Sequence, residues 1–401
     1  MGLPLPPHVS PPMWQAEFWL ERAPEADTPI CSEEQLAAFN ASVPERIGVP
    51  SVLALPDEVS AEQVRAWLAQ YAPAESPRYG YDGQPVSAEA FRALVERAVP
   101  PLPARVRVRF GLTVRRAALR GWPSGAVLTS EPFDYALDRA QESTVDVGQP
   151  VAAVLTSSDG RWIFALTPYY WGWLRAEAVA FGAREQVAAY SEAEPFLVTV
   201  APRGLVGTAW GGVTPQMGTR LPLLGEEADV WRVRVPTRDE AGALAFAEGY
   251  VPRAAGHFVR GYLPPTPRNV LAQAFKLLGE PYAWGGGKLG IFGRDCSRLV
   301  QDVYATVGVH LPRNVSLQGN VCRPLIVFEA TMSAEERRAA LVARGTIGTL
   351  LELPGHVMLY LGHVEGRPYV LHDTFRGVIV STLEEREPTL LERLRRAVLP
   401  C

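Results

Sequence analysis

The part of the sequence that most constrains the fold is a series of short runs between residues 104 and 262. In these runs apolar residues alternate with polar ones, and Gly, Pro, Asp or Ser separates one run from the next. Such a texture is typical of small β-barrels or sandwiches. The order of a turn, a Trp-bearing strand, a connector and an aromatic strand occurs twice, starting at "SSDGRW" and at "EEADVW". We therefore predict two tandem barrels, over residues 101–190 and 191–264.

Helical signals dominate the sequence before these barrels. Residues 1–30 are rich in proline and predict an extended arm. Ser32, Ser60 and Ser87 then each precede a helical stretch, and Ser60 with Gln63 fits a capping box. The stretches are "SEEQLAAFNASV", "SAEQVRAWLAQYA" and "SAEAFRALVERAV". Residues 1–100 are thus expected to form an arm and a helical segment, closed by the breaker "PPLP".

The 401 residues of the chain are enough for several domains. A third sequence pattern, with both helical and strand-like runs, begins after the linker "LPPTPR". Two helical patterns, "NVLAQAFKLLG" and "DCSRLVQDVYATVG", each end at a glycine. A third, "SAEERRAALVARG", has a capping box of Ser333 and Glu336. The strand-like runs "GTLLELP", "HVMLYLGHV", "RPYVLHDT" and "GVIVSTL" predict an antiparallel meander. We therefore expect residues 265–401 to form one α+β domain.

Charge and apolar content exclude several classes of protein. A formal net charge of −4 gives no concentrated basic surface, so no nucleic acid partner is expected. No run reaches the roughly 18 apolar residues that span a bilayer. The N-terminus "MGLPLPPHVSPPM" lacks the basic and apolar regions of a signal peptide, so none is expected in this chain. The four cysteines are too few for a disulfide framework, and their pairing stays open.

Cys296 is a candidate nucleophile because it lies in the first turn of a predicted helix. A helix N-terminus lowers the pKa of a cysteine, and the thiolate is the reactive form. A catalytic cysteine also needs a base on another element. His356 begins one predicted strand and His372 ends the next. Adjacent antiparallel strands would bring the two imidazoles together, one as the base and the other as its orienting partner.

The residues alone leave other interpretations open. A lone cysteine at a helix start is commonly a small buried residue, and a histidine at a strand end is commonly a polar residue with its partners satisfied. Zinc bound by Cys296, His356 and His372 is a further interpretation, although the spacing does not match common zinc sites. A cysteine hydrolase is one of several choices at this point.

The stretch "LLGEPYAWGGGKLGIFGRDCSRLVQDVYATVGVHLPRNVSLQ", with "GHVMLYLG" and "VLHDT", resembles the NlpC/P60 family of cell-wall peptidases. The family pattern runs Tyr-x-Trp-Gly-Gly, Asp-Cys-Ser, Leu-Pro-Arg and Gly-His-Val, and the resemblance covers residues from about 268 to 382. The preceding part resembles bacterial members that carry an N-terminal stabilising segment and two SH3-like domains. The resemblance implies a papain-like α+β catalytic domain, preceded by two small SH3-like β-barrels and an N-terminal helical segment.

The resemblance also implies roles for individual residues. Cys296 is the nucleophile, His356 the base and His372 the orienting member of a Cys-His-His triad. Tyr282 matches the tyrosine whose hydroxyl holds the oxyanion together with the Cys296 backbone N–H. Asp295 would anchor a peptide amine. The substrate-binding residues are Trp284, Gly285, Asp295 and Ser297.

This chain departs from the family pattern in two places. The family's "Pro-Gly-Asp-Leu" turn before the histidine strand is absent, and "ARGTIGTLLELPGHVMLYLG" stands in that region. An insertion-like segment, "GNVCRPLIVFEATMSAEERRAALVARG", precedes it. We expect Cys322 of that segment to lie in the core.

The family cleaves the γ-D-glutamyl to diamino acid bond of peptidoglycan stem peptides. The resemblance therefore implies a monomeric stem-peptide hydrolase that needs no metal or organic cofactor and prefers muropeptides with a free N-terminal L-Ala. In the first barrel, Glu131, Tyr135 and Asp138 are candidates for the ammonium group, because a carboxylate beside an aromatic ring suits a cation. An ordinary polar loop is the alternative for these three.

Two other functions stay open alongside the hydrolase. One is a peptidoglycan-binding protein with a silent catalytic domain. The other is a cysteine amidase or acyltransferase acting on another acyl group. The cell envelope is the expected location, periplasmic or lipoprotein-anchored if a signal was removed, and a cytoplasmic recycling enzyme is the alternative.

Overall fold

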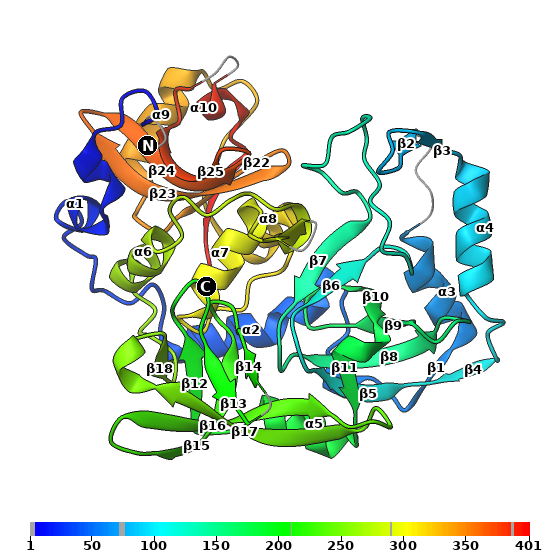
Figure 1. Cartoon of the computed structure of the whole chain (residues 1–401). Helices are drawn as coiled ribbons and strands as arrows, with labels where there is room; N and C mark the ends of the chain where they lie inside the picture. The colour runs from blue at the N-terminus through cyan, green and yellow to red at the C-terminus, as the bar shows by residue number, and fades with distance from the viewer. Residues whose placement is uncertain (1–4, 72–76, 210, 289–290, 386–388) are drawn as a thin grey trace.

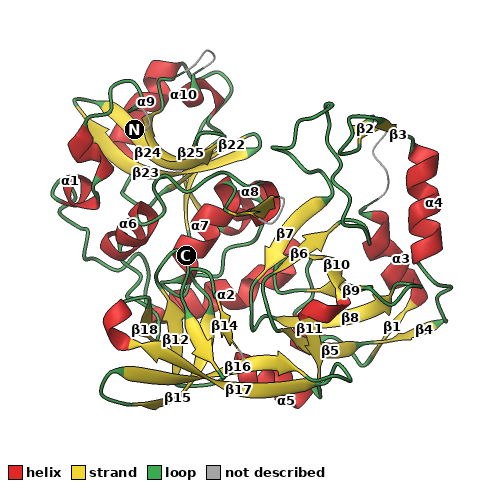
Figure 2. Cartoon of the chain, viewed as in Figure 1, coloured by secondary structure: helices red, strands yellow, loops and turns green. Residues whose placement is uncertain are grey.

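The structure of the chain is a computed structural model that describes residues 5–71, 77–209, 211–288, 291–385 and 389–401. Its three large sheets are all antiparallel, two with seven strands and a third with six. Figure 1 shows the six-stranded sheet at the upper left, one seven-stranded sheet at the right and the other at the bottom. Figure 2 shows that most helices lie around the six-stranded sheet and at the right edge. The predicted fold class, an α+β domain behind two small β units, is confirmed.

The first barrel unit is the seven-stranded sheet within residues 109–181, in the order β11-β5-β8-β9-β10-β6-β7. Its strands are β5 Arg109–Thr113, β6 Ala117–Arg120, β7 Gln141–Val145, β8 Pro150–Thr156, β9 Trp162–Leu166, β10 Trp171–Arg175 and β11 Val179–Phe181, with the turn η3 Ala176–Ala178. Strand β9 is buried on both faces: Phe164 packs in one core, and its neighbours Ile163 and Ala165 pack in another. A strand buried on both faces reads as a continuous apolar run, as β9 does.

The second barrel unit is the seven-stranded sheet within residues 196–260, in the order β14-β13-β17-β16-β15-β12-β18. Helix α5 Arg184–Ser191 connects it to the first. Its strands are β12 Phe196–Thr199, β13 Val206–Thr208, β14 Gly211–Val213, β15 Arg220–Glu226, β16 Val230–Arg238, β17 Leu244–Pro252 and β18 Phe258–Arg260, with the turn η4 Arg253–Ala255. A core of alternate strand residues, including Leu197, Val233 and Val251, fills its interior.

The third large sheet has six strands in the order β21-β26-β22-β23-β24-β25. We call it the catalytic sheet because its strands carry His356 and His372, the predicted catalytic residues. The predicted meander is present as β22 Leu350–Leu353, β23 His356–Val364, β24 Arg367–Thr374 and β25 Gly377–Thr382. Two strands that the sequence did not predict extend it, β21 Arg323–Val327 and β26 Arg396–Leu399. Two short strands, β19 Gly287–Lys288 and β20 Ile291–Phe292, form a separate hairpin next to the turn η5 Trp284–Gly286.

Helices cover both faces of the catalytic sheet. Helices α6 Pro267–Phe275 and α7 Cys296–Ala305 share one core with it, together with α8 Val315–Val321. Helices α9 Ala334–Arg344 and α10 Leu390–Arg393 share the core on the opposite face. The insertion-like segment thus supplies β21 and α9, and Cys322 lies buried in the first of these cores, as expected.

The N-terminal segment contributes to two cores. Its first part, η1 Pro11–Trp14, α1 Ala16–Leu20 and α2 Glu33–Ile47, packs on the catalytic domain. The expected extended arm is therefore wrong in part, because Met13 and Trp19 bury their side chains there from helical turns. The remainder packs on the first barrel unit: η2 Val52–Ala54, β1 Glu58–Ser60, α3 Ala61–Ala69, β2 Arg78–Tyr79, β3 Pro85–Val86, α4 Ala88–Ala98 and β4 Arg105–Arg107. The capping box of Ser60 and Gln63 is confirmed.

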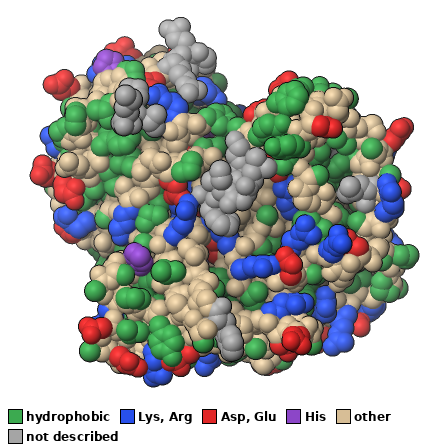
Figure 3. All heavy atoms as spheres, in the orientation of Figure 1, with side chains coloured by type: hydrophobic (Ala, Val, Ile, Leu, Met, Phe, Trp, Pro, Cys, Tyr) green, Lys and Arg blue, Asp and Glu red, His purple; other side chains and the backbone are tan. Residues whose placement is uncertain are grey.

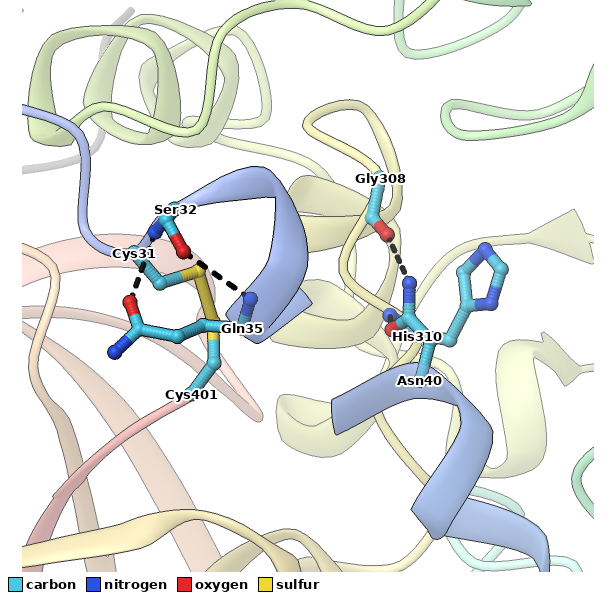
Figure 4. The surroundings of a disulfide bond; sticks show 7 residues. All are labelled: Cys31, Ser32, Gln35, Asn40, Gly308, His310 and Cys401. Carbon is cyan, nitrogen blue, oxygen red and sulfur yellow. Dashed lines mark hydrogen bonds between the residues drawn. A yellow bond between two sulfur atoms is a disulfide. The ribbon is translucent and has the colours of Figure 1, made fainter. Parts of the chain in front are cut away.

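A disulfide joins the start of α2 to the C-terminal residue of the sequence. Cys31 precedes α2, and Cys401 is the last residue; their Cα atoms lie 6.0 Å apart although 370 residues separate them in sequence. Figure 4 shows this bond beside the start of α2. Further along the same helix, Asn40 donates to the carbonyl oxygen of Gly308 at 2.8 Å and accepts from the N–H of His310 at 2.9 Å. Side-chain hydrogen bonds and a disulfide therefore fix α2 to the catalytic domain.

Candidate active site

Cys296 is the first residue of α7 because Asp295 caps that helix. The Asp295 Oδ1 accepts a hydrogen bond from the backbone N–H of Arg298 at 2.9 Å, as an N-cap carboxylate does. Leu299, Val300 and Val303 bury the face of α7 that packs on the catalytic sheet. Capping and packing together direct the N-terminus of α7, and with it the thiol, at the start of β23.

The Cys296 thiol is buried and lies against strand β23. The backbone N–H of Val357, the residue that follows His356, lies near the sulfur and acts to lower the pKa of the thiol. Burial, together with the nearby Asp295 carboxylate, raises the pKa of the thiol to about 12 against the lowering effect of that N–H. The expected lowering of this pKa by the helix terminus is therefore outweighed, and the resting side chain is a neutral thiol.

His356 and His372 come together as predicted. The Nε2 atom of His356 lies 2.8 Å from Nδ1 of His372, and Nε2 of His372 lies 2.9 Å from the hydroxyl oxygen of Ser381 on β25. His372 is buried, at 5% exposure. When Nδ1 of His356 is the basic nitrogen, its Nε2–H donates to His372, and the Nε2–H of His372 then donates to Ser381. This chain of hydrogen bonds keeps one tautomer of each ring.

Asp295 and Ser297 lie on either side of the nucleophile, and Arg313 holds both. Arg313 donates to the two oxygens of Asp295 at 3.0 and 2.5 Å and to the Ser297 hydroxyl at 2.7 Å. Although burial acts to raise it, the Arg313 guanidinium keeps the pKa of Asp295 below its ordinary value. The backbone N–H of Gly285 also donates to Asp295, at 3.0 Å. The carboxylate thus already has a cation and several donors, which leaves little capacity for a substrate amine.

Tyr282 lies on the same side of the site as the thiol. Its ring packs edge-on against Phe375, with centroids 4.9 Å apart, and Phe375 is 69% exposed. Burial raises the pKa of the Tyr282 hydroxyl well above its ordinary value, and the charges of Asp295 and Cys296 add to the effect. The hydroxyl therefore stays protonated and is a hydrogen-bond donor at every working pH.

The loop that carries Trp284 and Gly285 is docked on the first barrel unit. The Trp284 indole N–H donates to the carbonyl oxygen of Gln141 at 2.9 Å, and the Arg139 guanidinium lies 4.9 Å from the Trp284 ring centroid. Gly285 has φ +63°, and a Cβ there would meet the Gln141 side chain at 2.5 Å. Only glycine fits this approach of two backbones.

The three candidates from the first barrel do not form one site. Asp138 is buried, accepts from Arg120 at 2.6 Å, and binds the N–H groups of Leu128 and Ala140. The prediction that Asp138 meets a ligand is therefore wrong, because its carboxylate already organises its own loop. Tyr135 stacks on Tyr81, and Glu131 is exposed on the same loop.

Glu142 and Tyr170 lie near these residues and were not among the predicted site residues. The Tyr170 hydroxyl donates to the Glu142 carboxylate at 3.0 Å, and Glu142 adjoins Ser143, whose hydroxyl accepts from Arg313 at 2.9 Å. Burial raises the pKa of Glu142. Among the described residues its hydrogen-bond donor is the Tyr170 hydroxyl, and the positive charges of Arg313 and Arg120 also act on its carboxylate. Its only sequence signal was a charged residue on an otherwise uncharged strand.

Asp373 is a second residue that was missed. It follows His372 on β24, is 1% exposed, and neither oxygen has a hydrogen-bond partner in the described structure. The N–H of Thr374 lies nearby but does not reach hydrogen-bonding geometry. Burial, with the charges of Asp295 and Glu280, raises the pKa of Asp373 to about 9. This carboxyl is therefore protonated at neutral pH.

Buried charges connect α7 to the first barrel unit. Arg298 of α7 ion-pairs with Asp146, which follows β7, and donates to the Thr144 carbonyl oxygen at 3.0 Å. Both charged side chains are less than a tenth exposed. Arg116 of the barrel unit donates to the Gly286 carbonyl oxygen at 2.8 Å. The first barrel unit is thus part of the support of the cysteine helix.

The described residues contain no group of three or more His, Cys, Asp or Glu side chains arranged to hold a metal ion. Within the same ranges, no helix has the length and apolar character needed to cross a membrane.

Two family models match the chain. The NlpC/P60 family model matches residues 279–396, and a model for an SH3 domain of the SH3b1 type matches residues 129–175. The first range contains Cys296 and strands β21 to β25 of the catalytic sheet, and the second contains strands β7 to β10.

Curated relatives match over part of their length. The Gamma-D-glutamyl-L-lysine dipeptidyl-peptidase of Bacillus cereus is 27% identical over 189 residues, which are 43% of this chain and 52% of the relative. The peptidoglycan endopeptidase RipB of Mycobacterium tuberculosis is 32% identical over 133 residues, 30% of this chain and 51% of the relative. The chain thus spans about half the length of these relatives.

Solved structures extend the likeness to the whole fold. An NlpC/P60 endopeptidase from Photobacterium damselae subsp. piscicida has a TM-score of 0.75 at 17% identity, covering 99% of this chain and 96% of that one. An NlpC/P60 family protein from Bacillus cereus has a TM-score of 0.54 at 20% identity, covering 73% of this chain and 99% of that one. At these identities the likeness concerns the fold. The chain therefore carries a C-terminal domain of the NlpC/P60 family, preceded by an SH3 domain of the SH3b1 type.

Proposed function

We propose that this protein is a γ-D-glutamyl–diamino acid endopeptidase that cleaves peptidoglycan stem peptides with a Cys296-His356-His372 triad. The observation that carries the proposal is the hydrogen-bond chain from His356 through His372 to Ser381, which begins at the strand end where Cys296 lies. The names of the relatives add support: one is a γ-D-glutamyl-L-lysine dipeptidyl-peptidase and another a peptidoglycan endopeptidase.

Acylation begins with a proton transfer. Because the resting thiol is neutral, its proton passes to Nδ1 of His356 as the sulfur attacks the γ-carbonyl carbon of D-Glu. The Nε2–H of His356 stays bonded to His372, which stabilises the imidazolium. The Tyr282 hydroxyl and the Cys296 backbone N–H donate to the oxyanion. His356 then gives its proton to the leaving nitrogen of the diamino acid, and a thioester remains on Cys296.

Deacylation repeats these steps with water. His356 takes a proton from a water molecule as its oxygen attacks the thioester carbon, and the tetrahedral intermediate then collapses. The carbon–sulfur bond breaks, the sulfur recovers the proton from His356, and the peptide leaves with a free γ-carboxyl group. The two half-reactions thus use side chains, one backbone N–H and one water molecule.

Glu142 supports the proposed preference for a free N-terminal L-Ala, because its carboxylate could bind the ammonium group. A partly buried carboxylate is costly unless a cation or several donors neutralise it, and Glu142 has a neutral hydroxyl as its direct donor. A peptide ammonium group would complete this site, with Tyr170 beside it. Glu142 therefore replaces Asp138 as the proposed amine anchor of the first barrel unit.

The disulfide supports action outside the cytoplasm, because such bonds persist in oxidising compartments. Peptidoglycan, the proposed substrate, also lies outside the cytoplasm. We therefore propose the cell envelope as the working location.

Mass spectrometry of L-Ala-γ-D-Glu-diaminopimelate peptides tests the proposal. The wild type should cut the free-amine peptide after D-Glu and cut the N-acetylated peptide at least about tenfold more slowly, a loss of one ionic contact. Glu142→Gln should slow cleavage of the free-amine peptide and so reduce the ratio between the cleavage rates of the free and acetylated peptides. Glu131→Gln, on the exposed loop of the same unit, should leave both rates unchanged. If the wild type cuts neither peptide, the peptidase assignment fails. If it cuts both equally, the amine anchor alone fails.

A further inference from the structure

A cluster of exposed aromatic rings lies on the first barrel unit, outside the catalytic machinery. Tyr81 and Phe133 are each 62% exposed, and Tyr135 lies between them. The Tyr81 and Tyr135 rings are stacked at 4.8 Å with 28° between their planes, and Phe133 meets Tyr135 edge-on at 6.4 Å. We call Tyr81, Phe133 and Tyr135 the aromatic platform. Figure 3 shows hydrophobic side chains gathered at the upper right, beside the notch between the two upper lobes.

The platform is built from two segments that are held rigidly together. Backbone hydrogen bonds join Tyr79 and Thr129 in both directions, at 3.0 and 2.9 Å, which fixes the hairpin of β2 and β3 to the loop between β6 and β7. The Tyr135 hydroxyl donates to the Tyr81 carbonyl oxygen at 2.6 Å. A preorganised surface of this kind loses little entropy when a ligand binds.

The exposure of Phe133 requires a special backbone. Phe133 has φ +64°, a conformation that bulky residues rarely adopt. Its ring lies over Gly83, where a Cβ would come within 2.4 Å of the ring. A strained residue that presents an apolar ring to water points to a function for that ring.

A polar pocket of about 510 Å³ adjoins the platform, built from the same hairpin and loop. It is lined by Pro77, Arg78, Tyr79, Ser130, Glu131 and Arg139. Guanidinium donors and carboxylate and hydroxyl acceptors are therefore both available. Arg139 also lies over the Trp284 ring, so one lining residue of the pocket contacts the loop next to the nucleophile.

We propose that the platform and its pocket form a carbohydrate site that binds the sugar rings of a glycan strand. The apolar faces of pyranose rings stack on exposed aromatic faces, and their hydroxyl groups need both donors and acceptors. A stable protein partner would bury roughly 800 Å² on each side of the interface, more than three side chains present. A sugar attached to L-Ala would block a free amine, so the bound glycan belongs to a neighbouring strand. The site anchors the protein to the wall and is independent of cleavage.

Calorimetry with chitotetraose, using the full chain, tests this site. The wild type should bind saturably, and Tyr81→Ala and Phe133→Ala should each weaken binding roughly three- to tenfold, the contribution of one ring. Gly83→Ala should weaken it too, because the new methyl group displaces the Phe133 ring. Tyr250→Ala is the matched control, since Tyr250 is 47% exposed on the second barrel unit. It should leave binding unchanged.

Three results would overturn the carbohydrate site: no saturable binding by the wild type, equal binding by all platform variants, or an equal loss in Tyr250→Ala. Assays of peptide cleavage test the carbohydrate site and the peptidase proposal independently. The platform variants should cleave the sugar-free peptide at the wild-type rate. A wild type that binds chitotetraose but cuts no peptide would leave the carbohydrate site standing and the peptidase assignment rejected.

Discussion

Arg313 donates hydrogen bonds to both carboxylate oxygens of Asp295, at 3.0 and 2.5 Å, and so holds the residue that precedes the nucleophile in place. The two residues are 18 positions apart in sequence and belong to different motifs, Leu-Pro-Arg and Asp-Cys-Ser. Asp295 in turn caps α7 and accepts from Gly285 of the neighbouring loop. One ion pair therefore connects the cysteine helix, the glycine loop and, through Ser143, the first barrel unit.

Replacing Cys296 should separate activity from stability. We expect Cys296→Ala to lower peptide hydrolysis by at least about 10³-fold, since the nucleophile is lost, while the thermal unfolding temperature changes little. Cys322→Ala is the control, because Cys322 is the other free buried cysteine. It should keep its activity and lose some stability from the core. An active Cys296→Ala variant would exclude Cys296 as the nucleophile. An unfolded variant would show that this cysteine has a packing role instead.

Ser381 should act as a positioning residue for His372. Ser381→Ala removes the hydroxyl that lies 2.9 Å from the buried His372 Nε2. Losing this buried hydrogen bond costs about 1–3 kcal/mol, so we expect a roughly tenfold or greater fall in kcat with little change in KM. Ser381→Thr keeps the hydroxyl and should restore part of the rate. The control is His363→Ala, an exposed histidine on the same strand as His356. Similar kcat values for Ser381→Ala and the wild type would remove Ser381 from the mechanism.

Asp373 should make stability fall as the pH rises. Its pKa is about 9 in the folded protein and near 3.8 in an unfolded chain, so the folded state retains a proton that the unfolded state has lost. The stabilising effect is complete below about pH 4 and disappears progressively towards pH 9. Asp373→Asn carries no such proton, and its unfolding temperature should fall less than that of the wild type between pH 6 and pH 9.

Asp229→Asn, an exposed acid on the second barrel unit, serves as the control for that comparison and should follow the wild type. Thermal unfolding curves at several pH values measure the effect. Parallel curves for Asp373→Asn and the wild type would mean that Asp373 finds a partner in solution.

The buried ion pair of Arg298 and Asp146 should matter far more to stability than an exposed pair. Asp146→Ala leaves a buried guanidinium short of one counter-charge, and we expect a loss of about 3–5 kcal/mol in urea unfolding. Glu177→Ala breaks the exposed pair with Arg115 and should cost less than about 1 kcal/mol. Similar values for both variants would show that the first barrel unit does not support α7.

Local patterns predicted much of the fold. The capping box at Ser60 and Gln63 and the meander that contains His356 and His372 depend on residues close in sequence, and both are present. The helix that begins at Cys296 was predicted for the same reason. Each of these signals comes from periodicity or capping within a few residues.

Features that depend on distant contacts were not predicted. The arm around Trp19 is helical because it packs on the catalytic core, and no local signal encodes that packing. Glu142 reaches the site only because Arg313 lies beside Ser143, from another domain. Asp138 was a reasonable ligand candidate by type, but its pairing with Arg120 is a tertiary contact.

The bond between Cys31 and Cys401 turns all but the first thirty residues into a closed ring. A protease that cuts one exposed loop of this ring therefore opens it without releasing a fragment. The severed ends stay attached through the sulfur atoms, and the two pieces part only when a second cut or a reducing agent acts. In an environment rich in proteases, such a ring lets the molecule survive a single nick with its catalytic and binding domains still together.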